Sequence, residues 1–225
     1  MLHELPADIQ HLLVDHVQDV ENRHVINILF SGKSGSGRTT LMNYMINQID
    51  EKQRAVFVVN QPDEFHLESP RDAVHLIYGE SVSHEWLLRQ AGRMRPDWII
   101  SDELRDEAAH AHAIMGVGNI NTMGTIHAAS ATEALNHLTN LIALHKDADP
   151  TSASRLVNEC GYLVIHTTRK KSGHGGYISE ITQLHTRKPG VARRDHDATT
   201  VVGGNVHEPR VAYDLETLYS NTAGR

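Results

Sequence analysis

Residues 31–40 read SGKSGSGRTT, which nearly matches the phosphate-binding pattern G-x-x-x-x-G-K-[ST]. Gly32, Gly37 and Thr39 stand at their positions in this pattern, whereas Arg38 stands where the pattern has lysine. Glycines let successive backbone N–H groups approach an anion closely, at the point where the positive end of a helix begins. The stretch therefore predicts a phosphate site with an altered cationic side chain; a glycine-rich turn without a nucleotide is the alternative.

The residue types of this loop predict ATP and Mg²⁺ as its ligands. The predicted binding residues are Gly32, Lys33, Ser34, Gly35, Ser36, Gly37, Arg38, Thr39 and Thr40. The hydroxyl of Thr39 would coordinate Mg²⁺, and the cation at position 38 would reach the outer phosphates. Arg38 keeps the charge of lysine, but its planar fork is bulkier than an ammonium group. We expect binding to survive and catalysis to suffer, because a displacement of about 1 Å can cost roughly 100-fold in rate.

A second segment with possible chemistry is WIISDE, residues 98–103, an apolar run that ends in Asp102 and Glu103. It has the form of a Walker B strand, in which one carboxylate holds the Mg²⁺ shell and another polarises the attacking water. Strands often end in acids, so the segment alone is a weak signal. Its position, roughly sixty residues after a phosphate loop, makes the signal strong.

Hydrophobic periodicity predicts the elements that position these residues. Compact apolar runs predict strands over 25–30, 55–60, 74–78, 98–103, 121–128, 162–168 and 177–186. Helical spacing predicts helices over 5–20, 40–49, 83–94, 105–116, 131–145 and 151–160, with Ser83 and Ser130 as caps. This alternation predicts an α/β fold around a largely parallel sheet.

Composition excludes several classes of protein. The chain has 225 residues, a formal net charge of -7 and a single cysteine, Cys160. The charge argues against binding nucleic acid through the whole surface, and the cysteine count excludes an internal disulfide framework. No apolar run approaches the roughly 18 residues that span a bilayer, and the start MLHELPADIQ lacks the order of a signal peptide. We expect a cytoplasmic protein.

The 17 histidines are scattered without metal-ligand spacing, so the sequence predicts no histidine metal site.

Three stretches together resemble a known superfamily. Residues 93–108 read RMRPDWIISDELRDEA, residues 124–128 read GTIHA, and residues 177–184 read YISEITQL. In combination they resemble the secretion ATPases, the hexameric motors of type II and type IV secretion, type IV pili and conjugative DNA transfer. The resemblance covers about residues 24–186 and implies a RecA-like P-loop NTPase domain with a mostly parallel central sheet.

The resemblance also implies roles for particular residues. Glu103 would be the Walker B glutamate beside the attacking water, and Arg38 would supply charge to the phosphates. His127 would sense the γ-phosphate and couple hydrolysis to subunit movement; a packed core histidine is the alternative. The candidates for contacts to a neighbouring subunit's phosphates are Arg89, Arg93, Arg95 and Arg105, with surface salt bridges as the alternative.

The sequence departs from the superfamily pattern at several polar positions. Besides Arg38, the acidic box appears as NQPDEF over residues 60–65, with amides in place of its first two acids. Asn119 replaces one family histidine, Ala129 replaces the asparagine after the GTIHA histidine, and Asp102 replaces the usual glycine before the glutamate. Asp102 is a candidate to supply the Mg²⁺-shell carboxylate that the altered box no longer offers.

The predicted organisation has three parts. We expect an N-terminal helix over 1–23, a RecA-like motor domain over 24–188, and a mobile linker with a C-terminal segment over 189–225. Residues 211–219 are candidates to return to the sheet edge. The resemblance implies a further domain before the motor, and we expect the two dozen residues before the first predicted strand to hold only one helix in its place. The sequence therefore does not predict whether the chain forms a hexamer or which residues complete the nucleotide cleft.

The function expected from these features is that of a Mg-ATP-binding motor subunit that hydrolyses ATP slowly. It would act as a homo-oligomer, with a hexamer favoured, or with other subunits of a secretion machine, and would contact an inner-membrane complex peripherally. Direct nucleic acid binding is not expected. The rival interpretation is a degenerate subunit that binds nucleotide without hydrolysing it, or a structural scaffold. A small-molecule kinase fits the arginine-rich helix but not the GTIHA segment.

Overall fold

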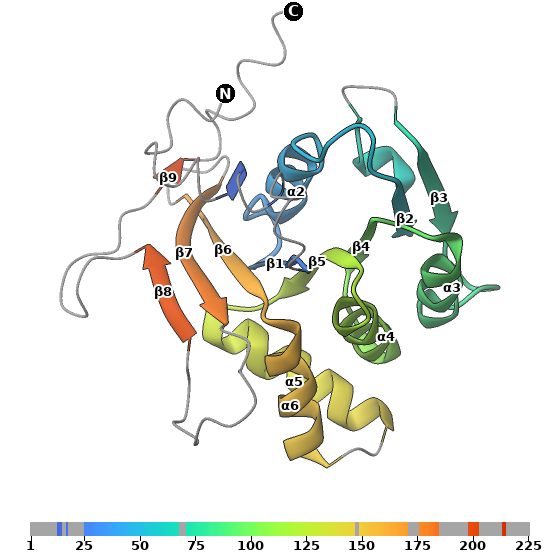
Figure 1. Ribbon diagram of the computed structural model, residues 1–225. Helices are drawn as coiled ribbons and strands as arrows, with labels where there is room; N and C mark the ends of the chain where they lie inside the picture. Colours follow the sequence, from blue (N-terminus) through green and yellow to red (C-terminus); the bar gives the residue numbers. More distant parts are fainter. Residues whose placement is uncertain are drawn as a thin grey trace, which may run out of the picture.

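A nine-stranded sheet forms the centre of the computed structural model, with helices on both faces (Figure 1). The structure describes residues 13, 14, 17, 25–67, 71–146, 149–170, 176–184, 198–202 and 213–214. The strand order is β3-β2-β4-β5-β1-β6-β7-β8, and β9 pairs with β7. The strands are β1 (Asn27–Gly32), β2 (Ala55–Val59), β3 (Ala73–Ile77), β4 (Trp98–Glu103), β5 (Asn121–His127), β6 (Leu163–Arg169), β7 (Gly176–Leu184), β8 (Ala198–Val202) and β9 (Tyr213–Asp214).

Six neighbouring strands of the sheet, in the order β3-β2-β4-β5-β1-β6, run parallel to one another. Strand β7 pairs with β6 in the antiparallel direction. Strands β8 and β9 also pair antiparallel to β7. The predicted α/β fold with a mostly parallel sheet is therefore confirmed. Because parallel strands end at one edge of a sheet, the segments that follow β1, β2, β3, β4 and β5 gather at the same edge, where α/β proteins bind ligands.

The helices are α2 (Arg38–Ile46), α3 (His84–Ala91), α4 (Asp106–Val117), α5 (Ala131–Lys146) and α6 (Pro150–Cys160). Short 3₁₀ turns, η2 (Pro62–Glu64) and η3 (Gly92–Met94), complete the set. Ser83 caps α3 by accepting a hydrogen bond from the Trp86 amide, and Ser130 accepts one from the Glu133 amide, as their sequence positions predict. Among the described helices, none combines the length and apolar character that crossing a bilayer requires.

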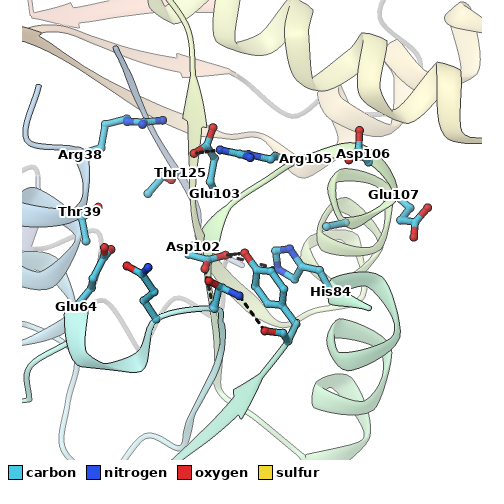
Figure 2. A pocket seen from close by; sticks show the side chains of 14 residues that line it. Arg38, Thr39, Glu64, His84, Asp102, Glu103, Arg105, Asp106, Glu107 and Thr125 are labelled. Atoms are coloured by element: carbon cyan, nitrogen blue, oxygen red, sulfur yellow. Dashed lines mark hydrogen bonds and ion pairs between the residues drawn. The ribbon is translucent and has the colours of Figure 1, made fainter. Parts of the chain in front are cut away.

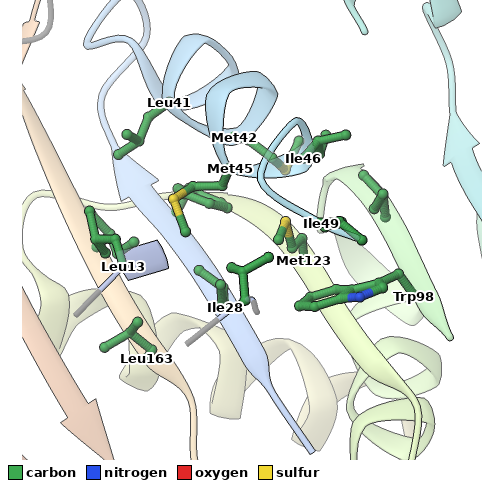
Figure 3. Close-up of a cluster of buried hydrophobic side chains, with 14 of the residues drawn as sticks. Leu13, Ile28, Leu41, Met42, Met45, Ile46, Ile49, Trp98, Met123 and Leu163 are labelled. Carbon is green, nitrogen blue, oxygen red and sulfur yellow. The ribbon is translucent and has the colours of Figure 1, made fainter. Parts of the chain in front are cut away.

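Alternation along the strands divides the core between the two faces of the sheet. Ile28 and Phe30 pack with α2 on one face, and Figure 3 shows Leu41, Met42 and Met45 of that helix over the sheet. Leu29, between them in sequence, packs instead with α4, α5 and α6 on the other face. Strands buried on both faces read as continuous apolar runs, which is why the sequence predicts them well.

The ends of the chain lie largely outside the description. Of the helix predicted over 1–23, only residues 13, 14 and 17 are described, all helical, and Leu13 and Val17 are buried in the core beside α2. Strand β8 lies within the stretch predicted to be a linker, so these residues add a strand to the sheet. Strand β9 lies within residues 211–219 and pairs with β7 at Tyr177 and Ile178. The rest of 189–225 lies outside the described residues.

Candidate functional site

The phosphate loop follows β1 directly and leads into α2, the strand–loop–helix order that its pattern requires. Gly32, Gly35 and Gly37 have φ values of 153°, 71° and 90°, a conformation that side chains disfavour. A Cβ atom on Gly32 would stand 2.4 Å from the Ser36 hydroxyl and 2.5 Å from the Thr167 carbonyl. The backbone of the loop therefore depends on glycine for both conformation and space.

Residues of β6 and β7 contact the phosphate loop and fix its position. The hydroxyls of Ser36 and Thr167 lie 2.8 Å apart, and the Thr167 hydroxyl also donates to the Ser31 carbonyl at 3.2 Å. Ser36 and Thr167 are each only 1% exposed. Gly176, the first residue of β7, lies so close that a Cβ atom there would be 1.9 Å from the Ser36 carbonyl oxygen. Residues distant in sequence thus fix the loop, whereas Lys33, Ser34 and Gly35 at its tip are exposed.

Arg38 and Thr39 open α2 and line a cavity of about 730 Å³ beside the loop. Figure 2 shows the Arg38 side chain extending across the cavity toward Glu103. Its Nη1 atom is buried and has no hydrogen-bond partner among the described residues. Burial lowers the pKa of Arg38, an effect that the nearby charge of Glu103 opposes. A guanidinium held in this way offers an unused donor at the place where the loop pattern puts its cation.

Glu103 ends β4 and stays ionised. Burial by itself would raise its pKa, but a hydrogen bond from Arg105 and the charges of Arg105, Arg38 and His127 outweigh burial and lower the pKa. The Arg105 guanidinium donates to Glu103 Oε2 at 2.9 Å. The carboxylate is therefore a hydrogen-bond acceptor at neutral pH, with one of its oxygens engaged by its own chain.

Asp102, the preceding residue, has a contrasting environment. Its Oδ2 atom accepts the Asn60 amide at 2.7 Å, and its Oδ1 atom accepts the Tyr78 hydroxyl at 2.7 Å. Burial raises the pKa of Asp102 to about 6, although both hydrogen bonds favour the ionised form. The Tyr78 ring stacks on His84, whose Nε2 lies 2.7 Å from the Ser101 hydroxyl. Asp102 is thus tied to the segments that follow β2 and β3.

The cavity brings together residues from the ends of four strands and from three helices, α2, α3 and α4. Its lining consists of Arg38, Thr39, Asn60, Gln61, Glu64, Tyr78, His84, Asp102, Glu103, Arg105, Asp106, Glu107, Ala108 and Thr125. Four predicted site residues, Arg38, Thr39, Asp102 and Glu103, are among them. His127 ends β5, is exposed and lies outside the lining, but its charge helps to lower the pKa of Glu103. The predicted loop residues 32–37 and Thr40 also lie outside the lining.

Sequence reasoning did not single out Tyr78 or His84. A signal existed, because Tyr78 directly follows β3 and His84 opens α3, at the edge where the other site residues gather. Their joint role with Asp102 depends on side-chain directions that no local pattern encodes.

Three of the four arginines proposed for intersubunit contacts have partners within the chain. Arg89 donates to Glu85 at 2.7 Å, Arg93 to Gln90 at 3.5 Å and Arg105 to Glu103 at 2.9 Å. Arg95 ends η3 with a φ of 54°. The intersubunit assignment stays a prediction for all four residues.

Comparisons with known proteins agree with this architecture. Residues 7–164 match the family described as "Type II/IV secretion system protein". The chain is 34% identical over 158 residues to the type IV secretion system protein PtlH of Bordetella pertussis, a match that covers 66% of this chain and 46% of PtlH. It is 30% identical over 175 residues to the conjugal transfer protein TrbB of Rhizobium radiobacter, covering 77% of this chain and 53% of TrbB.

Among solved structures, the VirB11 ATPase of the Brucella suis type IV secretion system, determined in complex with sulphate, is similar with a TM-score of 0.68 and 28% identity. The match covers 77% of this chain and 51% of that chain. The chain thus spans about half the length of the relatives that it matches. It belongs to the type II/IV secretion system protein family and has the RecA-like fold of the secretion ATPases.

Proposed function

We propose that the chain binds Mg-ATP between the phosphate loop and Glu103 and hydrolyses it slowly. The observation that supports this most directly is the buried Nη1 of Arg38, which has no hydrogen-bond partner among the described residues and extends toward Glu103. Phosphate oxygens are strong acceptors for guanidinium donors. A phosphoryl group between the loop and the carboxylate would satisfy this donor.

The residues of this chain divide the binding of Mg-ATP between them. The backbone of residues 32–40 would hold the phosphates. The Thr39 hydroxyl would hold Mg²⁺ directly, and Asp102 would hold it through a water molecule. Each Asp102 oxygen has a second lone pair beyond the hydrogen bond that it already accepts, so this contact is chemically possible. When bound, Mg²⁺ supplies positive charge that neutralises the phosphate oxygens.

Glu103, Arg38 and His127 would act on the reacting groups. The ionised Glu103 accepts a hydrogen bond from a water molecule and so orients it, and its low pKa favours this role over proton storage. Arg38 would bind oxygens of the transferred phosphoryl group. Since phosphoryl transfer depends on positioning and electrostatics, the bulkier guanidinium at position 38 supports slow turnover rather than different chemistry. His127 would sense the outer phosphate from the end of β5.

The names of the relatives support a role in secretion or conjugation. We infer a motor domain over 24–188 that works in an oligomeric ring, with six subunits favoured, or together with other subunits of such a machine. As its site of action we infer the cytoplasm, with peripheral contact to an inner-membrane complex, which is the expectation from the sequence.

A subunit that binds nucleotide without hydrolysing it is the second candidate, and a specific contact favours it. Arg105 engages Glu103 Oε2 at 2.9 Å and so competes with a water molecule for that oxygen. Together with the arginine at position 38, this contact would prevent ATP hydrolysis, while the backbone of the phosphate loop would still bind the nucleotide.

Phosphate release with Mg-ATP tests both candidates. We would compare the native chain with Glu103→Gln and Arg38→Lys, and measure the particle mass by light scattering in each case. Slow hydrolysis predicts measurable release by the native chain and a loss of at least about 100-fold in Glu103→Gln, the usual size of an acid–base contribution. Arg38→Lys should be faster than the native chain.

Asp63→Asn is the matched control, because Asp63 is an exposed carboxylate outside the cavity lining. It should release phosphate at the native rate. No release by the native chain, with recovery in Arg38→Lys, would support the non-hydrolysing subunit. Release that is equal in the native chain and Glu103→Gln would overturn the assignment of the carboxylate.

A further inference from the structure

Three helices bring two glutamates and a histidine together at the edge of the cavity, whose lining includes Glu107 but neither of the other two residues. Glu85 lies in the first turn of α3, Glu107 in the first turn of α4, and His145 near the end of α5. One ligand atom from each residue, a ring nitrogen and two carboxylate oxygens, lies within 4.8 Å of the others. Figure 2 shows Glu107 turned away from Arg38 and Glu103. The Glu107 carboxylate therefore points away from the groups assigned to ATP.

The His145 ring lies between the two carboxylates without a good hydrogen bond to either. Its Nδ1 is 3.5 Å from Glu107 Oε2, and its Nε2 is 3.7 Å from Glu85 Oε1. Ordinary N–H···O bonds are about 2.7–3.2 Å long, so both contacts exceed that range. Nε2 is also buried and has no hydrogen-bond partner among the described residues. A buried ring nitrogen in this state is unfavourable unless another group binds it.

The spacing and the ligand types fit a cation. In a tetrahedral zinc site with bonds of about 2.0–2.2 Å, neighbouring ligand atoms are separated by roughly 3.3–3.6 Å. The contact of His145 Nδ1 with Glu107, at 3.5 Å, is close to that separation. Glu85 lies nearer the other ring nitrogen, so rotations of the three side chains would be needed to bring one nitrogen and two oxygens, which lie within 4.8 Å of one another, around a common point. Imidazole with carboxylates suits Zn²⁺, Co²⁺, Ni²⁺ or Mn²⁺, whereas Mg²⁺ and Ca²⁺ prefer oxygen ligands alone. We propose that Glu85, Glu107 and His145 bind a divalent transition-metal ion of this class.

The surroundings of the cluster are compatible with a metal ion. Both glutamates lie at helix N-termini, where the helix dipole favours the ionised carboxylate that a metal requires. Arg89 donates to Glu85 Oε1 at 2.7 and 3.2 Å, which orients the carboxylate. His110, three residues after Glu107 on the same helix, has its ring centroid 6.4 Å from that of His145. Either His110 or a water molecule would fill the fourth position.

A metal ion at this cluster would join α3, α4 and α5 at one point. Glu107 lies four residues after Glu103, in the helix that begins beside Arg105. The ion would therefore stabilise the wall of the cavity that carries the proposed catalytic carboxylate, without contacting ATP. Binding to the folded state alone would also raise the stability of the protein in proportion to the logarithm of the metal concentration.

Titration of the full chain with Co²⁺ tests the proposal independently of nucleotide. The protein is first treated with a chelator, and binding is then followed by visible absorption of Co²⁺ and by competition with Zn²⁺. We expect one saturable equivalent in the native chain. His145→Gln and Glu107→Gln should each weaken that site more than roughly 10-fold, because loss even of a group that only orients a metal ligand costs about 10–100-fold.

His66→Gln and Glu80→Gln are the matched controls, because both residues are exposed and lie outside the cluster. Both should keep the site, and thermal unfolding without metal should show that all four variants are folded. Zn²⁺ should raise the unfolding temperature of the native chain and the controls but not that of His145→Gln. Persistence of the site in His145→Gln, or equal loss in His66→Gln, would assign binding to other histidines and overturn the proposal. Absence of a saturable site in the native chain would also overturn the proposal.

Discussion

The two sides of the proposed nucleotide site are built in different ways, and the cavity lining meets the phosphate loop at Arg38 and Thr39. The loop wall, residues 32–37, is backbone held in shape by glycines and by the buried Ser36–Thr167 contact. The acid wall, Asp102 and Glu103 with their partners, is made of side chains. The loop wall offers backbone N–H groups whose positions depend on the chain path, whereas the chemistry of the acid wall depends on the charges next to its two carboxylates.

This difference explains how the chain can carry an arginine at position 38 and still keep a phosphate-binding loop. Binding by backbone amides depends on chain path, which Gly32 and Gly176 protect. Catalysis depends on the acid wall and on the cation that faces it. We therefore expect changes in the loop wall to act on affinity and changes in the acid wall to act on rate and on pH dependence.

The largest effect is expected for Gly32→Ala. The new Cβ atom would lie 2.4 Å from the Ser36 hydroxyl and 2.5 Å from the Thr167 carbonyl, so the loop must move. We expect affinity for ATP to fall by roughly 100-fold, which corresponds to about 2.7 kcal/mol. Titration of a fluorescent ATP analogue measures this change.

Gly79→Ala is the control for this prediction, because a Cβ atom at Gly79 meets nothing within 4 Å. It should bind the analogue as the native chain does. If Gly32→Ala also kept native affinity, the backbone of the loop would not be the phosphate site, and the contrast between the walls would disappear.

The next effect, on the acid wall, is expected for Arg105→Gln. Loss of the guanidinium frees Glu103 Oε2 and removes the main opposition to burial, so the pKa of Glu103 should rise. At pH 8, where the carboxylate stays ionised, phosphate release should increase by about 3- to 10-fold, within the range of a single general-base contribution. As the pH falls, activity should be lost at a higher pH than in the native chain. ATP affinity should not change.

Arg155→Gln provides the control, since Arg155 is a surface arginine paired with Glu159 on α6. A decrease in turnover in Arg105→Gln, seen only where light scattering detects oligomers, would instead favour the intersubunit role predicted for Arg105 from its sequence position.

A smaller effect, on stability, is expected for Asp102→Asn. The pKa of Asp102 is raised from 3.8 to about 6 in the folded chain, so folding favours the protonated form. Its contribution is fully present below about pH 4 and is lost as the pH rises through about 6. The side chain is 18% exposed, and after allowance for this exposure we expect the variant to gain about 1–2 kcal/mol relative to the native chain at pH 8. Urea unfolding at pH 4 and pH 8 measures the difference.

The same variant tests the proposed Mg²⁺ contact. If Asp102 holds the Mg²⁺ shell, Asp102→Asn should require several-fold more Mg²⁺ for half-maximal phosphate release. An unchanged Mg²⁺ requirement would leave Asp102 with only its link to Asn60 and Tyr78. Tyr78→Phe separates the two roles, because it removes one hydrogen bond and keeps the carboxylate.

The sequence predicts the loop wall much better than the acid wall. The backbone role of Gly32 and Gly37 can be predicted from their residue type and spacing, and the buried strands around them can be predicted because they are apolar runs. The contact of Gly176 with Ser36 spans most of the chain, so no local pattern could reveal it. Strand β8 was not predicted, because an edge strand within a segment rich in glycine, proline and charge lacks the apolar run of a buried one.

The different environments of Asp102 and Glu103 in the acid wall could not be predicted from the sequence, for another physical reason. Asp102 and Glu103 are neighbours with the same chemistry, and burial moves the pKa of Asp102 up while the charge of Arg105 moves that of Glu103 down. Only the arrangement of partners from β2, β3 and α4 separates them. The cluster of Glu85, Glu107 and His145 was missed for the same reason, since its members come from three helices.

The smallest effect is expected for Ser83→Ala. Ser83 caps α3 through the Trp86 amide at 3.2 Å, and loss of such a cap costs about 1 kcal/mol of stability. Because α3 begins with His84, which stacks on Tyr78, fraying of this turn should loosen the acid wall and leave the loop wall untouched. We therefore expect a slightly lower rate of phosphate release with unchanged ATP affinity. Ser130→Ala removes the equivalent cap next to α5 and should match the stability loss without the change in rate. Equal effects of both variants on the rate would mean that general destabilisation, rather than support of the acid wall by α3, determines turnover.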